Sequence, residues 1–127
     1  MNQRFENEIS LFIKSYIACA LWSSTDDGGV PFDSKYEKED IEDDSLFLIV
    51  IDCYNFYREN HTHWEDKVGY DSSSAGHDFW LTRNGHGAGF WDREELSDWT
   101  GELLTDRAKA FGEVNLYVGD NGNIFYS

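Results

Sequence analysis

The stretch Ala75–Arg93, AGHDFWLTRNGHGAGFWDR, constrains the fold more than any other part of the sequence. Asn84-Gly85 lies between two runs of strand-forming residues. This is the strongest short-range signal for a β-hairpin, because both turn positions need a positive φ angle. A two-residue turn would place Trp80 opposite Gly89, so that the indole covers a strand with no side chain to fill the space. The sequence therefore predicts a hairpin over residues 75–93 with Trp80 packed on Gly89.

A second Asn-Gly pair occurs at positions 121–122, after a run in which apolar and polar residues alternate. It predicts another hairpin over residues 114–126. In the register of a two-residue turn, Val118 faces Phe125 on the core side of this hairpin.

Apolar residues recur at helical spacing in three segments, residues 3–22, 45–60 and 99–111. Part of the second segment also fits a continuous buried strand, but the pattern extends to Tyr57, which is too long for a typical strand. We therefore expect a helix that Asp44 or Ser45 can cap. Because this helix is apolar around its girth, it should be covered on more than one side.

These elements predict one α+β domain spanning residues 1–127. Its core would be an antiparallel sheet of two β-hairpins, about four strands, with about three helices packed on one face. The other sheet face would carry Trp80, Tyr117 and Tyr126. If nothing covers these side chains, they form an exposed aromatic patch.

The chain is strongly acidic, with 25 acidic and 10 basic residues and a net charge of −15. This charge disfavours direct binding of DNA or RNA and favours basic partners. Nine acidic residues against two lysines give residues 26–44 a local charge of −7. A solvated loop with a short helix is the simpler interpretation of such a run, and a row of carboxylates spaced like phosphates is the functional one. The nine residues are Asp26, Asp27, Asp33, Glu37, Glu39, Asp40, Glu42, Asp43 and Asp44.

Neither a metal nor a cofactor is expected. Cys19 and Cys53 each lie in an apolar helical pattern and lack the spacing of a zinc or disulfide framework, so buried free thiols are expected. His61, His63 and Glu65 are close in sequence, but histidines two residues apart share a face only on a strand, and no third distant ligand is indicated. No signal peptide and no apolar run of membrane-spanning length is visible, which favours a cytoplasmic protein.

For an enzyme, the best constellation is His77, Asp78, His86, Asp92 and Arg93. A His–Asp pair can serve as a general base and the group that orients it. However, the sequence contains no nucleophile motif, and its glycine-rich stretch at 85–89 does not lead into a predicted helix. We therefore expect no catalytic residues.

The motif GHDFWLTRNGHGAGFWDR, followed by a helix and then FGEVNLYVGDNGNIFYS, resembles a family of small uncharacterised proteins of tailed bacteriophages. The upstream segment ALWSSTDDGGVPFDSKYEKEDI is similar to the usual N-terminal half of that family. The resemblance runs from about residue 12 to residue 126 and departs from the family pattern at residues 60–74. It implies a phage origin and a single α+β domain, and it supplies no catalytic residues.

Together these features predict a phage accessory protein in the cytoplasm of an infected bacterial host. It would bind and inhibit a host protein with a basic surface through DNA-mimic-like carboxylates. Defence nucleases, CRISPR nucleases among them, and other nucleic-acid-binding proteins are the natural targets. The alternative is a non-catalytic interaction module that docks a partner through the aromatic sheet face, and an uncharacterised enzyme is the third possibility.

Overall fold

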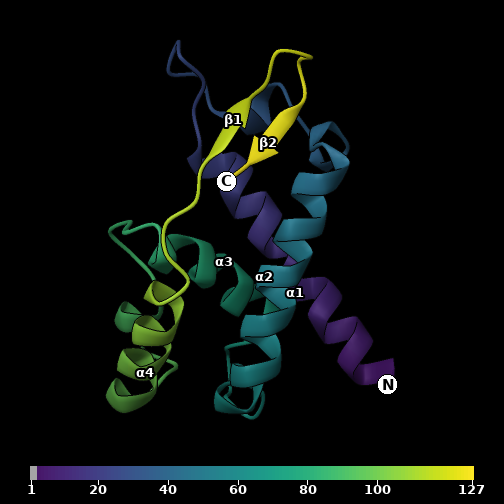
Figure 1. Cartoon of the computed structure of the whole chain (residues 1–127). Coiled ribbons are helices and arrows are strands. Elements are labelled where there is room, and N and C mark those ends of the chain that lie inside the picture. Colours follow the sequence, from purple (N-terminus) through teal and green to yellow (C-terminus); the bar gives the residue numbers. More distant parts are fainter. Residues whose placement is uncertain (1–2) are drawn as a thin grey trace.

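The computed structural model describes residues 3–127, and this part of the chain is mostly helical (Figure 1). Two short strands pair into a two-stranded antiparallel sheet. The predicted four-stranded sheet covered by helices on one face is therefore wrong. The elements are α1 (Gln3–Ser23), α2 (Asp43–Asn60), α3 (Ser72–Arg83), α4 (Asp98–Lys109), β1 (Leu116–Val118) and β2 (Ile124–Tyr126).

The three helices predicted from periodicity are confirmed as α1, α2 and α4, within two residues at each end. The apolar side of α1 packs on α3 and α2 and does not contact a large sheet. In the view of Figure 1, α2 passes in front of α1, and α4 lies beside α3. One cluster of buried apolar side chains runs through these contacts, and its centre is a stack of aromatic rings that includes Phe12, Phe56 and Phe79.

The predicted hairpin over residues 75–93 is wrong, because its first half is helix α3. Asn84-Gly85 ends this helix instead of turning a hairpin. The amide of Gly85 donates to the Thr82 carbonyl across 3.2 Å, and the amide of His86 donates to the Leu81 carbonyl across 3.0 Å. These two bonds, with Gly85 at φ +70°, form a Schellman C-cap. Asn-Gly suits both structures because each needs a glycine at positive φ.

Asp71 begins α3, since its side chain accepts a hydrogen bond from the Ser74 amide. The following turns are buried on nearly every side, from Ala75 to Arg83. A helix that is covered all round shows no clear apolar stripe in its sequence. This is why the helical period was not visible here.

Trp80 does not pack on Gly89. Its indole nitrogen donates to the Ser23 hydroxyl across 2.7 Å, at the C-terminal end of α1. Gly89 instead lies against Thr82, whose hydroxyl oxygen leaves no space for a Cβ at this position. The same hydroxyl accepts the Phe90 amide, so α3 is held to the 3₁₀ turn Phe90–Asp92.

The C-terminal hairpin is confirmed, but its register differs from the prediction by one residue. Val118 pairs with Ile124, and Tyr117 pairs with Phe125. No non-glycine residue from 3 to 127 has a positive φ angle, so Asn121 cannot form the expected two-residue turn. The amide of Gly119 donates to the Asn123 carbonyl across 2.8 Å, which leaves a three-residue loop, 120–122, in which Gly122 alone takes positive φ, at +83°.

The hairpin docks on the N-terminal half of α2. The Glu42 amide donates to the Ile124 carbonyl, and the Tyr126 amide donates to the Ser45 hydroxyl. A buried guanidinium completes this junction: Arg83 donates to the hydroxyls of Tyr16 and Tyr126 and to the carbonyls of the loop after α4. The hairpin and residues 24–44 consequently lie at one end of the molecule, at the top in Figure 1.

Candidate functional site

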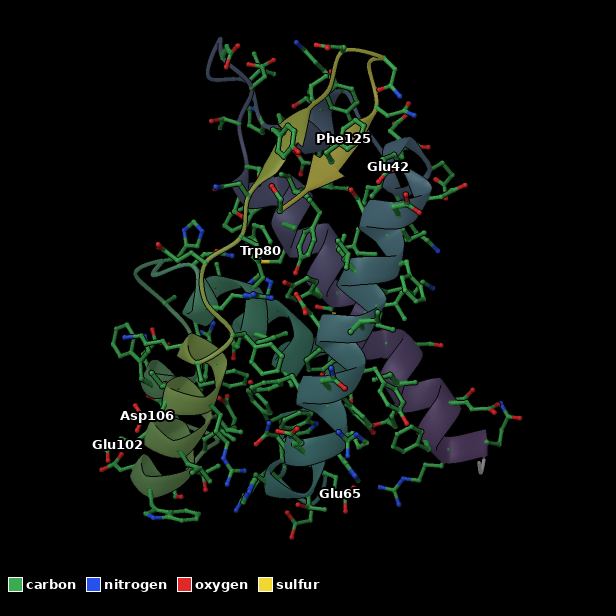
Figure 2. All side chains as sticks on the ribbon, viewed as in Figure 1. Glu42, Glu65, Trp80, Glu102, Asp106 and Phe125 are labelled. Atoms are coloured by element: carbon green, nitrogen blue, oxygen red, sulfur yellow. The ribbon has the colours of Figure 1, made fainter. Side chains whose placement is uncertain are left out.

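The acidic segment, residues 26–44, runs from the loop after α1 to the first turn of α2. It passes beside the C-terminal hairpin, where Ile41 forms a bridge with Ile124. Figure 2 shows Glu42 at this end of the molecule near the hairpin residue Phe125, and Glu65 at the opposite end. The structure thus gathers the densest run of carboxylates on one end.

Three of the nine predicted residues have structural roles. Asp26 accepts the amides of Gly28 and Val30 and pairs with Lys35 at 2.7 Å, and the hydrogen bond from Lys35 lowers the pKa of this carboxyl. Asp40 accepts the Glu37 amide across 2.8 Å. These bonds shape the loop and the 3₁₀ turn Lys38–Asp40.

Glu42 is the third acidic residue with a structural role, because it is the N-cap of α2. The prediction that Asp44 or Ser45 caps this helix is therefore wrong. Its two carboxylate oxygens accept the amides of Ser45, at 2.6 Å, and Asp44, at 3.2 Å. Hydrogen bonding from Ser45 holds the pKa of the Glu42 carboxyl below its ordinary value. The ionised carboxylate of Glu42 therefore stabilises the first turn of α2.

The other six carboxylates are exposed to solvent. Within residues 3–127, none of them forms an ion pair with another side chain. Their charge is therefore not neutralised inside the described chain and acts outward. The six residues are Asp27, Asp33, Glu37, Glu39, Asp43 and Asp44.

An exposed apolar face on α2 begins where the acidic segment ends, and sequence reasoning missed it. Phe47 is 64% exposed and Leu48 is 48% exposed, and the face continues along the helix through Val50, Ile51 and Tyr54. The signal was present, because α2 is apolar around its girth. This apolar girth predicts that α2 is covered on several sides. In the structure, α1, the C-terminal hairpin and α4 cover other sides of α2 and leave this face exposed.

The expected aromatic sheet face is not formed. Trp80 is buried beside Tyr16 in the helical core, and Tyr126 is buried at the Arg83 junction. Only Tyr117 is exposed, where its ring stacks on Phe125 with the ring centroids 5.8 Å apart. With a two-stranded sheet, there is no face on which the three residues can meet.

Three residues of the enzyme constellation meet at an open polar pocket, which His77, Asp78 and Arg93 line. His86 lines a different pocket, and Asp92 lies beside Arg93, with its oxygen 3.9 Å from Nε. His86 therefore lies on a different surface from His77, Asp78 and Arg93, although these residues are close in the sequence.

Asp78 is almost completely buried, and its hydrogen-bonding capacity is used within the fold. Arg93 donates to both carboxylate oxygens, across 2.9 and 2.6 Å, and the Tyr70 hydroxyl donates across 2.7 Å. Burial raises the pKa of Tyr70, and the hydrogen bond with Asp78 raises the pKa of Arg93. This arrangement ties α3 to the segments on either side of it, and it matches a structural ion pair better than a general base waiting for a substrate.

His61, His63 and Glu65 are not arranged to bind a metal ion. Nδ1 of His61 lies 2.8 Å from Glu65, while the His63 ring lies beside Trp99. In residues 3–127, no group of three or more His, Cys, Asp or Glu side chains is arranged to hold a metal ion. Cys19 and Cys53 are buried free thiols, as predicted.

No helix within residues 3–127 combines the length and the apolar character needed to cross a bilayer. Comparison of the chain with protein-family models, with curated proteins and with solved structures gives no significant match. The bacteriophage resemblance consequently stays a prediction.

Proposed function

We propose that this chain is a non-catalytic binding protein whose acidic segment occupies a basic surface on a partner protein. The observation that carries the proposal is the set of six exposed carboxylates, none of which is paired with another side chain of the described chain. Unpaired carboxylates create a negative surface that attracts a basic partner and steers its approach.

The partner we propose is a host protein that normally binds nucleic acid, such as a defence nuclease. The basic groove of such a protein exchanges counterions with phosphates, and a dense row of carboxylates offers it the same charge. Binding there would block access of DNA or RNA and so inhibit the host protein. This fits an acidic accessory protein of a bacteriophage that acts in the cytoplasm of its host.

The alternative module that docks through an aromatic sheet face is not retained, because two of its three side chains are buried. Catalysis is not proposed, because the Asp78 carboxylate, which would have to orient a catalytic histidine, is bound by Arg93 and Tyr70.

The test compares two variants that remove the same charge from different surfaces. The acidic-segment variant changes Glu37, Glu39, Asp43 and Asp44 to their amides and leaves the structural carboxylates Asp26, Asp40 and Glu42 intact. The matched control variant changes Glu94, Glu102, Asp106 and Glu113 to their amides. These residues are exposed, and Glu102 and Asp106 project from the outer side of α4 (Figure 2).

Each immobilised protein is incubated with lysate of a bacterial host, and the retained proteins are eluted with increasing salt. The wild type and the control variant should retain the same protein, and duplex DNA should displace it. The acidic-segment variant should lose it at lower salt. Equal retention by both variants, or retention that duplex DNA does not affect, would contradict the proposal.

A further inference from the structure

Exposed apolar residues form a continuous stripe along α2. Phe47, Ile51 and Tyr54 follow the spacing i, i+4 and i+7, so they lie on one side of the helix, and Leu48 and Val50 flank them. All five are at least 36% exposed. Contiguous exposed apolar residues, unlike scattered ones, mark an interaction site.

We propose that this stripe binds the same stripe of a second copy of the chain, with the two α2 helices antiparallel. A two-fold axis that passes between Val50 and Ile51 makes the contact isologous, so each residue meets a counterpart at the same distance from the axis on the other helix. Phe47 then lies opposite Tyr54 of the second copy. At each end of the contact, Phe47 of one copy therefore packs on Tyr54 of the other copy.

The charges at the two ends of the stripe are complementary in this arrangement. Asp43 and Asp44 precede the stripe, and Arg58 follows it. The antiparallel contact brings Arg58 opposite the acidic pair of the second copy. Arg58 is available for this role, because its side chain is 54% exposed and its nearest carboxylate is Glu59, at 3.7 Å.

The net charge of −15 selects the antiparallel arrangement over the parallel one. Parallel helices would place the two acidic segments side by side. In the antiparallel pair, the two N-terminal ends lie roughly 20–25 Å apart along the axis at 1.5 Å per residue. This exceeds two Debye lengths of about 8–10 Å at physiological salt, so the repulsion is screened.

The dimer would present two acidic segments at opposite ends of one assembly. This consequence depends on the proposed function, whereas the dimer itself does not. One helix face per copy is small beside a standard interface of about 800 Å² per partner, so we expect a reversible dimer with Kd on the order of micromolar.

The test is sedimentation of the full chain over concentrations from about 0.05 μM to about 100 μM, which lie on both sides of the expected Kd. The wild type should approach twice the monomer mass of 14.7 kDa at the upper end. Phe47→Glu should remain monomeric, with the circular dichroism spectrum of the wild type. The control Val68→Glu, at an apolar side chain that is 95% exposed and outside α2, should dimerise as the wild type does.

Charge reversal separates this contact from nonspecific association. Arg58→Asp should weaken the dimer at least several-fold, and the addition of Asp44→Arg should restore it. A wild type that stays monomeric at every concentration would overturn the proposal and leave the stripe to an unrelated partner. Equal dimerisation of Phe47→Glu and Val68→Glu would also overturn it.

Discussion

The guanidinium of Arg83, near the end of α3, donates a hydrogen bond of 2.8 Å to the carboxylate of Asp52, in the middle of α2. The Arg83 side chain is only 2% exposed, while Asp52 reaches solvent. The Tyr126 hydroxyl donates to the same Asp52 oxygen across 2.6 Å. One buried cation on α3 therefore joins this helix to α1, α2 and the C-terminal strand, which positions the hairpin beside the acidic segment.

Replacement of Arg83 by Leu should destabilise the fold strongly. It would leave the Tyr16 and Tyr126 hydroxyls and two backbone carbonyls without their donor, and loss of one partner of a buried pair costs about 3–5 kcal/mol. Tyr126→Phe removes a single hydroxyl and should cost about 1–2 kcal/mol. Urea unfolding measures both free energies. Equal stabilities for Arg83→Leu and the wild type would show that the junction does not hold the fold.

The crossing of α1 and α3 should not tolerate a side chain at Gly76. A Cβ there would clash with the backbone carbonyl of Phe12, which is a part of α1 that cannot move independently. Gly76→Ala should therefore lower the free energy of unfolding by about 1–3 kcal/mol, despite the higher helix propensity of alanine. Gly87→Ala is the control, since nothing lies within 4 Å of its Cβ position. If the two variants have the same stability, the helices do not cross at this point.

Both thiols should be unreactive in the folded protein. Cys19 and Cys53 are buried, and burial raises the pKa of Cys19 to about 12 and that of Cys53 well above its ordinary value. A disulfide reagent at pH 8 should label neither residue in buffer and both in denaturant. Rapid labelling of one thiol in the native state would place that residue at the surface.

The Glu42 cap should make stability depend on pH in one direction. Because its pKa is lower in the folded chain than the ordinary value of 4.5, the ionised carboxylate stabilises the fold above this pH. That contribution is lost as the pH falls through the folded pKa. Glu42→Gln should therefore lower Tm at pH 7, and its Tm should converge with that of the wild type near pH 3. A Tm difference that persists unchanged at pH 3 would mean that the charge of Glu42 is not responsible.

The sequence predicted α1, α2 and α4, because their apolar residues recur at a helical spacing that can be counted. The sequence did not predict α3, because this helix is buried on nearly every side and its apolar residues do not form a single stripe. The two Asn-Gly pairs show a second limit. Gly85 and Gly122 both take positive φ, but one ends a helix and the other closes a three-residue loop. Which structure forms depends on the tertiary contacts of the flanking segments.

Only some features of the candidate site could likewise be predicted from the sequence. Exposure of most acidic residues followed from their charge, since unpaired carboxylates are rarely buried. The structural roles of Asp40 and Glu42 depend on local backbone geometry, which composition does not reveal. The apolar stripe on α2 could not be separated from core residues, because an apolar side chain has the same identity in a core and at an interface.

The proposed function depends on the charge of the acidic segment, and the salt dependence of partner binding measures the effect of this charge. The measurement is the affinity of the purified host protein for the wild type, the acidic-segment variant and the matched control variant between about 50 and 200 mM salt, a range over which counterion-dependent binding changes strongly. We expect the affinity to fall steeply with salt for the wild type and the control, and to be lower, with a shallower salt dependence, for the acidic-segment variant. Equal affinity of the acidic-segment variant and the wild type at every salt concentration would contradict the proposed function.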